Sequence, residues 1–261
     1  PAGVVMGLVA STSPIATLYF KVLISLMTRN VLILSPHPIS AACTAHATDY
    51  LHDVAVRAGA PKNCIQIQRS LSLGATEKLM SDSRIKVIVA TGGSPMVRAA
   101  YSSGRPALGV GPGNVPVIID EGVNLNDTAE FIIGSKNFDH GSPCNSESTV
   151  IPLASIANSF GQALKAKGAH LCNPQETQKL RDYAYPKGQF NAAIVGKPSA
   201  WIAQKAGFNV AKDTTALVVY INQIGAKVEP FSKEKLSPIL AFHTANDRDD
   251  SISIAQDLLE V

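Results

Sequence analysis

The chain has 261 residues, of which 46% are hydrophobic and 16% are charged, and its mean hydropathy is +0.12. This composition supports one large or two ordinary domains and excludes an intrinsically disordered protein. The net charge is +3 with scattered lysines and arginines, so the sequence carries no nucleic-acid-binding pattern. No apolar run reaches the roughly 18 residues of a membrane span, and the apolar start lacks the basic flank of a signal peptide.

The spacing of the cysteines bears on metal binding and on the redox environment of the protein. Cys43, Cys64, Cys144 and Cys172 fit neither a zinc motif nor a dense disulfide framework. We therefore expect no metal site and a reducing, cytoplasmic environment. Because the sequence begins with proline and ends inside a helical pattern, SISIAQDLLEV, we also expect both ends to be incomplete.

The first part of the chain alternates short apolar runs with helical periodicity. Strands are expected at residues 4–10, 30–34, 65–67 and 86–90, and helices at residues 14–28, 39–58, 73–80 and 96–102. Thr12 or Ser13 is available to cap the first helix, and Pro14 suits its first turn. This alternation, with continuously apolar strands, predicts a parallel sheet covered by helices on both faces.

The pattern changes at GVGPGNVPVIID, residues 109–120, where glycines and prolines precede another strand. This segment is the candidate domain boundary. Beyond it, helices are expected at residues 125–138, 155–167 and 175–185, and strands at residues 149–152 and 215–221. A polar loop, DHGSPCNSES, follows the first of these helices, so the sequence predicts an α/β protein throughout.

Cys144 is the strongest local candidate for chemistry. The other three cysteines lie in apolar periodic segments, which is typical of buried structural thiols. Cys144 instead lies in the polar loop between a helix and a strand. A nucleophilic thiolate needs partial exposure and electropositive surroundings such as free backbone N–H groups. The local pattern fits a catalytic thiol, and it also fits an ordinary loop cysteine.

Three further features carry weaker signals. Thr91, Gly92 and Gly93 join an apolar strand to a helix, where a backbone can approach a phosphate, although an ordinary turn has the same pattern. The GVGPGN segment indicates either close backbone approach or an interdomain turn. His140 could polarise Cys144 or a substrate, but a locally hydrogen-bonded histidine is the simpler interpretation.

Five segments together resemble the CoA-acylating aldehyde dehydrogenases. They are FKVLISLMTRNVLILSPHP (20–38), VIVATGGSPMVRAAYSSGRPALGVGPGNVPVIID (87–120), SKNFDHGSPCNSES (135–148), NAAIVG (191–196) and EPFSKEKLSPILA (229–241). This group includes the acetaldehyde, succinate-semialdehyde and propionaldehyde enzymes and the aldehyde domain of bifunctional aldehyde–alcohol dehydrogenases. The match runs in order over nearly the whole chain, and AYSSGRPALGVGPGNVP is its most specific part.

The resemblance implies a partial Rossmann-like NAD-binding domain over residues 1–114 and a partial α/β catalytic domain over residues 115–261. It places Cys144 on the catalytic nucleophile and Glu234 on the glutamate that holds the nicotinamide ribose, whereas the pattern alone would make Glu234 a solvated surface charge. The other expected cofactor contacts are Thr12, Ser35, His37, Pro38, Thr91, Gly92, Gly93, Val97, Gly109, Val110 and Gly111. The implied cofactor is NAD, with NADP as an alternative because Ser35 and His37 offer neither an acid nor an arginine to the ribose. Coenzyme A is the implied co-substrate, a small aldehyde the substrate, and a homo-oligomer the assembly.

The residue at position 109 favours the acylating branch. Hydrolytic members resemble ELGGK there, and their glutamate activates the water that cleaves the thioester. A missing general base should slow hydrolysis by ~10²–10⁴-fold, whereas a CoA thiolate is already a strong nucleophile. Gly109 is therefore a physical reason to expect CoA as the acyl acceptor.

Two departures from the family leave other interpretations open. Ser13 stands where relatives have an asparagine that binds the oxyanion, and losing one such donor costs ~10²–10³-fold in rate. Pro143 removes a backbone N–H beside the nucleophile. The expected reaction is attack by Cys144 on an aldehyde, with Ser13 assisting, then hydride transfer and acylation of CoA. The alternatives are a hydrolytic or acyl-phosphate-type member, or a non-catalytic member that binds ligands on the same fold.

Overall fold

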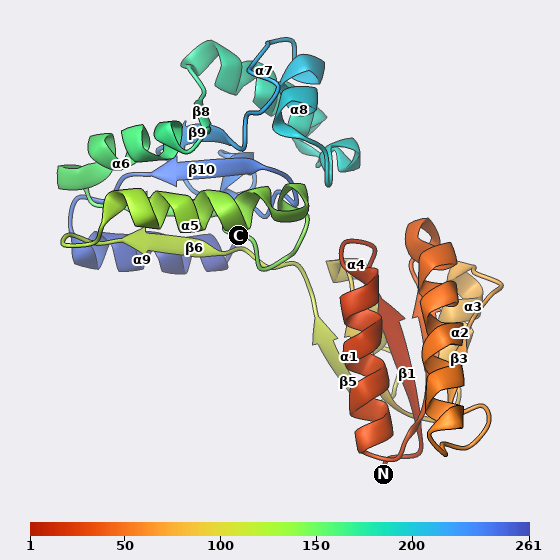
Figure 1. Cartoon of the computed structure of the whole chain (residues 1–261). Helices are drawn as coiled ribbons and strands as arrows, with labels where there is room; N and C mark the ends of the chain where they lie inside the picture. The colour runs from red at the N-terminus through yellow and green to blue at the C-terminus, as the bar shows by residue number, and fades with distance from the viewer. The chain divides into compact units, whose positions relative to one another are not determined.

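The computed structural model describes all 261 residues. They form two compact units, Pro1–Pro112 and Gly113–Val261, and each is built around its own five-stranded parallel sheet (Figure 1). The expected α/β fold is confirmed. None of the helices combines the length and the apolar character needed to cross a membrane.

The sheet of the first unit has the strand order β3-β2-β1-β4-β5, and every neighbouring pair is parallel. Its strands are β1 (Val4–Val9), β2 (Val31–Pro36), β3 (Ile65–Ile67), β4 (Ile85–Thr91) and β5 (Ala107–Val110). The connecting helices are α1 (Pro14–Met27), η1 (Pro38–Ser40), α2 (Ala41–Arg57), α3 (Leu73–Ser81) and α4 (Ser94–Tyr101). The strand order changes direction between β1 and β4, and in such sheets ligands bind beyond the carboxyl ends at that point.

Successive side chains of β1 point to opposite faces of the sheet, and each face has its own hydrophobic cluster. Val5 and Val9 pack into a cluster with residues of α1 and α2, while Met6 and Leu8 pack into a second cluster with residues of α3 and α4. Both clusters consist almost entirely of buried aliphatic side chains. Because both faces of the sheet are buried, the sequences of its strands are continuous apolar runs.

The second unit repeats the architecture with the strand order β6-β7-β10-β9-β8, again with parallel neighbours. Its strands are β6 (Pro116–Ile119), β7 (Thr149–Pro152), β8 (His170–Leu171), β9 (Leu217–Ile221) and β10 (Ile239–His243). Its α-helices are α5 (Leu125–Asn137), α6 (Ala154–Ala166), α7 (Pro174–Ala184), α8 (Ser199–Ala206) and α9 (Arg248–Leu259). Short 3-10 turns complete it at η2 (Phe138–Gly141), η3 (Pro186–Gly188), η4 (Ala192–Ile194) and η5 (Pro230–Ser232). Alternate residues of the central strands face α5 and α6 on one side and α7, α8 and α9 on the other.

Most expected elements are present within about two residues of their expected bounds, and β3 and β7 match them fully. The strands β5, β8 and β10, the helix α8 and the 3-10 helices η3, η4 and η5 were missed. β5 lies inside the glycine-rich segment and β8 has two residues, so neither shows a strand pattern of its own. The expectation that Cys43 is buried is wrong, because it faces outward from α2 while Thr44 faces inward. Cys64 and Cys172 are buried, and burial raises the pKa of the Cys172 thiol to about 12.

Lys21 is a buried cation in the first unit. Lys21 belongs to α1 and is 1% exposed. Its Nζ donates a hydrogen bond of 2.9 Å to Thr91 Oγ1 at the end of β4. A Cβ at Gly7 would lie 3.0 Å from Lys21 Cδ, so the small residue in β1 makes room for this chain. Burial lowers the pKa of Lys21 to about 8.

This depressed pKa predicts how Lys21 affects stability at different pH values. The folded state prefers the neutral amine, so the cost of the charged form is complete below pH 8 and disappears as the pH rises through the unfolded value of 10.5. The melting temperature of Lys21→Met minus that of wild type should therefore fall between pH 8 and pH 10.5. Thermal unfolding across this range checks it, with exposed Lys78→Met as the matched control. A difference for Lys21→Met that does not change with pH would contradict this assignment.

Candidate active site

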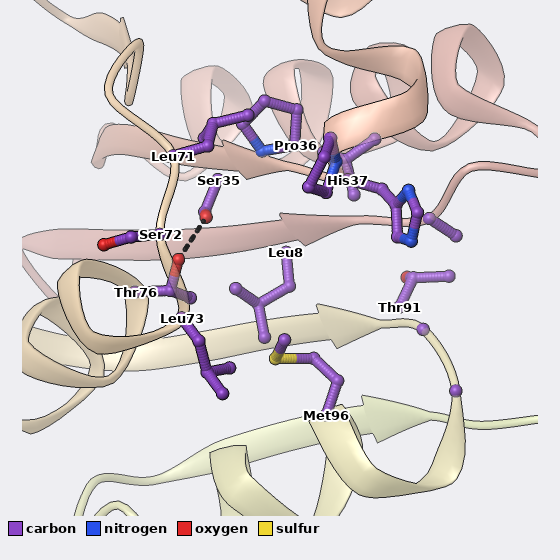
Figure 2. A pocket seen from close by; sticks show the side chains of 15 residues that line it. Leu8, Ser35, Pro36, His37, Leu71, Ser72, Leu73, Thr76, Thr91 and Met96 are labelled. Atoms are coloured by element: carbon purple, nitrogen blue, oxygen red, sulfur yellow. Dashed lines mark hydrogen bonds between the residues drawn. The ribbon is translucent and has the colours of Figure 1, made fainter.

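A cavity of about 250 Å³ lies in the first unit, beyond the carboxyl ends of β1, β2 and β4 (Figure 2). Its lining residues are Leu8, Val9, Ala10, Ser35, Pro36, His37, Pro38, Leu71, Ser72, Leu73, Thr76, Thr91, Gly92, Gly93 and Met96. This is the position where the strand order changes direction, which is the general ligand site of open parallel sheets.

The structure brings six of the expected cofactor residues to this cavity. They are Ser35, His37, Pro38, Thr91, Gly92 and Gly93. Thr12, Val97, Gly109, Val110 and Gly111 do not line it. Ser72 and Gly93 are the N-caps of α3 and α4, so two helix N-termini with their positive dipole ends adjoin the cavity.

The cavity wall is mainly apolar, with the Ser35–Thr76 pair on one side and His37 with Thr91 on the other (Figure 2). Ser35 Oγ and Thr76 Oγ1 are hydrogen-bonded at 3.2 Å, and His37 Nδ1 accepts a hydrogen bond from the backbone N–H of Ile39 at 3.2 Å. Leu8, Leu73 and Met96 are among the apolar side chains of the wall (Figure 2). Neither an acidic residue nor an arginine lines the cavity, so the wall carries no charge that would select between a ribose and a 2′-phosphate.

Gly109 in β5 has no room for a side chain. Its backbone N–H donates to Tyr101 Oη at 2.9 Å, and a Cβ there would lie 2.6 Å from Val97 Cγ1 and 2.9 Å from the Tyr101 ring. Both neighbours belong to α4, which packs on β5. A glutamate at this position would require the side chains of Val97 and Tyr101 to move, so the present packing of α4 on β5 suits glycine.

Cys144 lies in the second unit, in a loop that begins with three successive left-handed residues. Asp139, His140 and Gly141 have φ values of 47°, 52° and 67°. A Cβ at Gly141 would lie 2.6 Å from the carbonyl oxygen of Ser237 and 3.1 Å from that of Lys136, so only glycine fits. Asp139 stabilises the turn because its Oδ2 accepts a hydrogen bond of 2.8 Å from Ser142 Oγ. Such strained backbone is found preferentially at functional sites.

The thiol of Cys144 is free and exposed. Cys144 lies inside a turn that a 3.0 Å hydrogen bond from the Ser146 N–H to the Pro143 carbonyl closes. A Cβ at Gly113 would lie 2.8 Å from the Cys144 carbonyl oxygen, so this glycine packs directly on the nucleophile segment. No hydrogen bond or ion pair links His140 to Cys144 in the structure.

Glu234 is partly buried, so its interpretation as a solvated surface charge is wrong. Its Oε1 accepts a 3.2 Å hydrogen bond from the N–H of Gly113, the residue that also contacts Cys144. Burial raises the pKa of Glu234, and the Gly113 N–H and two buried lysines, Lys136 and Lys235, act in the opposite direction. In the second unit, Glu234 and the Cys144 segment therefore both contact Gly113.

Lys235 fixes the loop that carries Glu234. It is 1% exposed, and its Nζ donates hydrogen bonds to Phe231 O at 2.6 Å, Ser148 Oγ at 2.7 Å and Lys233 O at 2.8 Å. Burial lowers the pKa of Lys235. Because Ser148 follows the Cys144 loop, the Lys235 ammonium links the Cys144 loop to the loop that carries Glu234.

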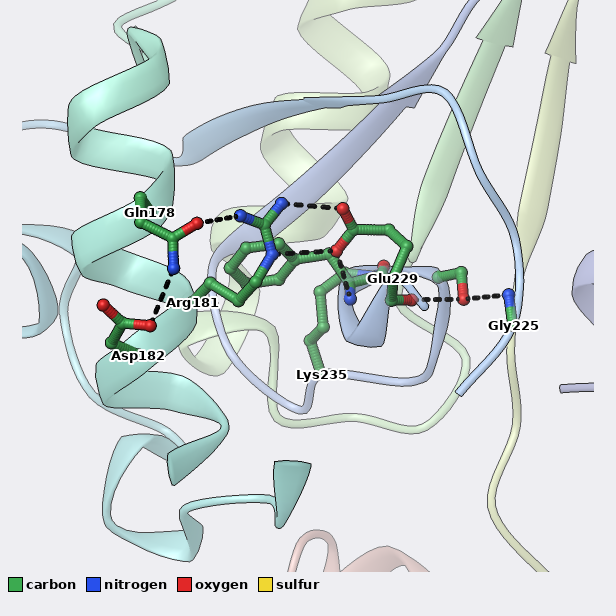
Figure 3. Close-up of polar contacts among 8 residues, drawn as sticks. Gln178, Arg181, Asp182, Gly225, Glu229 and Lys235 are labelled. Atoms are coloured by element: carbon green, nitrogen blue, oxygen red, sulfur yellow. Dashed lines mark hydrogen bonds and ion pairs between the residues drawn. The ribbon is translucent and has the colours of Figure 1, made fainter. Parts of the chain in front are cut away.

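An ion pair holds the same loop from the side of α7 (Figure 3). Arg181 Nη2 lies 2.7 Å from Glu229 Oε2, and the Arg181 guanidinium lies 5.5 Å from the ring centroid of Phe231. Glu229 Oε1 also accepts a 3.1 Å hydrogen bond from the Phe231 N–H. Nothing in the sequence marked these charged residues, because no local pattern shows that Lys136, Glu229 and Lys235 are buried or that Arg181 pairs with Glu229.

Ser13, the other residue expected in catalysis, occupies the N-cap position of α1. Its φ is −146°, and its side chain makes no capping hydrogen bond. Pro14 follows at the first helical position, where its missing N–H needs no partner. The hydroxyl of Ser13 is therefore not used to stabilise the helix.

The packing at Gly141 predicts that substitution by alanine changes the free energy of unfolding very differently at Gly141 and at Gly134. Gly141→Ala should reduce the free energy of unfolding by about 2–4 kcal/mol, because the new methyl group meets two carbonyl oxygens at a left-handed position. Gly134→Ala in α5 meets nothing within 4 Å and should stabilise the helix by about 0.5–1 kcal/mol. Urea unfolding measures both, and equal effects of the two substitutions would refute the packing argument.

The chain is similar in sequence to proteins of a known family. The family model for the aldehyde dehydrogenase family matches residues 1–179. The chain is 40% identical to the aldehyde-alcohol dehydrogenase of Streptococcus pneumoniae, in an alignment that covers 100% of this chain and 30% of the relative.

Two solved structures share the fold. The acetylating aldehyde dehydrogenase of Geobacillus thermoglucosidasius has a TM-score of 0.97 at 44% identity, and the propionaldehyde dehydrogenase of Rhodopseudomonas palustris with bound propionyl-CoA has 0.92 at 28% identity. Each comparison covers 100% of this chain and 57% of the other, so the chain spans little more than half of these structures. The resemblance to the acylating enzymes is confirmed, and by sequence and by fold the chain belongs to the aldehyde dehydrogenase family.

Proposed function

We propose that this chain is the central part of a CoA-acylating aldehyde dehydrogenase, which oxidises a small aldehyde with NAD or NADP and transfers the acyl group to coenzyme A. The observation that carries the proposal is the exposed thiol of Cys144 on a loop of strained, closely packed backbone. Such a loop fixes a nucleophile more firmly than a flexible surface loop would.

The first unit supplies the cofactor site in this proposal. The cavity beyond β1, β2 and β4 offers apolar walls for an adenine ring and the N-termini of α3 and α4 for phosphate groups. Thr91 is held at the cavity by the buried ammonium of Lys21. The expected contacts that do not line the cavity, among them Val97 and Val110, would serve the nicotinamide half. When bound, the nicotinamide accepts the hydride that the aldehyde carbon loses.

The second unit supplies the nucleophile. The Cys144 sulfur attacks the aldehyde carbon, and its thiol proton goes to solvent. After the hydride has left, the acyl group remains on Cys144 as a thioester. The backbone N–H of Cys144 is the proposed donor to the oxyanion, and Ser13 is the proposed second donor because its hydroxyl caps no helix N–H. Glu234 is the proposed ribose ligand, held by Gly113 and the Lys235 loop.

The packing of Gly109 selects the acyl acceptor. Hydrolysis of the thioester would need a general base, and Gly109, which packs closely against Val97 and Tyr101, supplies no carboxylate at that position. The thiolate of coenzyme A needs no such base. The proposal also includes a homo-oligomer and a reducing cytoplasmic setting, and the four free cysteines support the latter.

The proposal predicts a rate that depends on Cys144 and on CoA. In the full-length protein, NADH formation from a panel of small aldehydes should require CoA, and Cys144→Ala should abolish it. Cys43→Ala is the matched control because Cys43 is the other exposed cysteine, and it should retain the wild-type rate. Wild-type turnover by Cys144→Ala would rule out the assigned nucleophile. Turnover without CoA would establish a hydrolytic enzyme, and NAD binding without any turnover would establish a binding module.

The cofactor site is tested by a charge placed at the edge of the cavity. Leu73 lines the cavity and is 65% exposed, so Leu73→Asp should leave the fold intact and repel the phosphates of NAD. We expect NADH affinity to fall by about tenfold, which corresponds to about 1.4 kcal/mol. Ile39→Asp makes the same change at a residue that is 86% exposed and outside the cavity lining, and it should leave affinity unchanged. NADH fluorescence titration measures both, and equal affinities of the two variants would contradict this site.

A further inference from the structure

Three side chains of metal-binding types meet at the edge of the second sheet, away from the residues of the proposed reaction. His170 lies in β8, Cys172 directly follows that strand, and Glu176 lies in the first turn of α7. The ligand atoms of the three residues all lie within 4.8 Å of one another, and His170 Nε2 is 3.0 Å from Glu176 Oε2. None of the three is among the residues that the proposed reaction uses.

The backbone fixes His170 and Cys172 on the same side of the strand. Residues two apart along a strand point to the same face. The His170 N–H donates to Ala216 O and the Cys172 N–H to Val218 O, both at 2.9 Å, so the register against β9 is maintained through Cys172. The imidazole and the thiol are therefore neighbours because of strand pairing, whether or not a ligand is bound.

A capping box fixes the carboxylate of Glu176. Glu176 Oε2 accepts a 2.9 Å hydrogen bond from the Asn173 N–H, and Asn173 Oδ1 accepts one of 2.9 Å from the Glu176 N–H. Pro174 occupies the first helical position and pre-sets the turn. Because backbone groups hold the carboxylate, little conformational entropy is left to lose when it binds a cation.

Burial differs among the three residues in a way that suits a metal with one open position. Cys172 is 5% exposed, whereas the side chains of His170 and Glu176 are 30% and 19% exposed. The sulfur lies at the inner side of the group and the imidazole and carboxylate face solvent. Three protein ligands with one side accessible to water match a tetrahedral site whose fourth ligand is water.

Charge and ligand type identify the metal. A thiolate and a carboxylate neutralise a divalent cation, and a neutral imidazole adds no charge, so the partly buried site would carry no net charge. Sulfur and imidazole ligands favour Zn²⁺ over Mg²⁺ and Ca²⁺, which prefer oxygen. Zn–N and Zn–O bonds of about 2.0–2.1 Å place tetrahedral ligand atoms roughly 3.3 Å apart, so the His170–Glu176 separation needs to widen by only a few tenths of an ångström.

We propose that His170, Cys172 and Glu176 form a Zn²⁺ site, with water as fourth ligand, that fastens the edge strand β8 to the N-terminus of α7. On binding, a metal–sulfur bond replaces the thiol S–H bond and the proton goes to solvent. The hydrogen bond between His170 and Glu176 is replaced by bonds from both residues to the metal. The site is independent of the proposed dehydrogenase activity, because none of its three residues belongs to the proposed cofactor site or to the Cys144 loop.

Cobalt titration tests the site with an optical signal. The full-length protein carrying Cys144→Ala, which removes the exposed nucleophile, is titrated with Co²⁺ under anaerobic conditions. We expect saturation at one Co²⁺ per chain with a thiolate-to-cobalt charge-transfer band, loss of the band when Zn²⁺ is added, and a higher melting temperature with Zn²⁺. Cys172→Ser should abolish the band, and Cys43→Ser, at an exposed cysteine, should retain it.

Glu176→Gln separates metal ligation from helix capping. Its amide oxygen still accepts the Asn173 N–H, so the capping box remains, while we expect Co²⁺ affinity to fall at least tenfold through loss of the charged ligand. Metal-free melting curves of the variants verify that they fold. A folded protein without a saturable charge-transfer band, or a band that survives in Cys172→Ser, would overturn the proposal. In those cases the three residues form only a hydrogen-bonded pair beside a buried thiol.

Discussion

The position of Cys144 depends on close backbone contacts that only glycine permits. Gly141 packs against the carbonyl oxygen of Ser237 before the nucleophile, and Gly113 packs against the carbonyl oxygen of Cys144 itself. The first contact joins the loop to the segment that precedes β10, and the second joins it to the Gly113 N–H that binds Glu234. A side chain at either glycine would displace the loop, so the geometry of the nucleophile, the carboxylate and the sheet is determined together. The strained turn at residues 139–141 is maintained because its surroundings leave no other arrangement.

Buried lysines support both functional regions. Lys21 lies behind Thr91 in the first unit, and Lys235 lies behind Glu234 in the second. An ammonium group out of water is costly unless hydrogen bonds replace its hydration, and Lys235 has three acceptors while Lys21 has one. Lys21 binds the Thr91 hydroxyl at the end of β4, and Lys235 binds backbone carbonyls of the loop that carries Glu234. Arg181 and Glu229 extend this arrangement to α7, so the loop of Glu234 is held by an ion pair as well as by Lys235 (Figure 3).

The sequence was informative where a signal is local. Apolar periodicity located most strands and helices, and the polarity of the segment around Cys144 indicated an exposed thiol, as the structure has it. It was not informative where an environment is assembled from distant residues. Glu234 looked like a surface charge because its partner Gly113 lies 121 residues away. The exclusion of a side chain at Gly109 depends on how α4 packs on β5. His170, Cys172 and Glu176 follow no known zinc spacing, and only the junction of β8 with α7 brings them together.

In the proposed reaction, Cys144 carries the acyl group, and CoA rather than water removes it. Intact-mass analysis of the full-length protein, incubated with a small aldehyde and NAD in the absence of CoA, tests this most directly. The account predicts an acyl adduct that peptide mapping places on Cys144, that persists in water and that disappears when CoA is added. Steady NADH production without CoA and without an adduct, or an adduct on another residue, would contradict it.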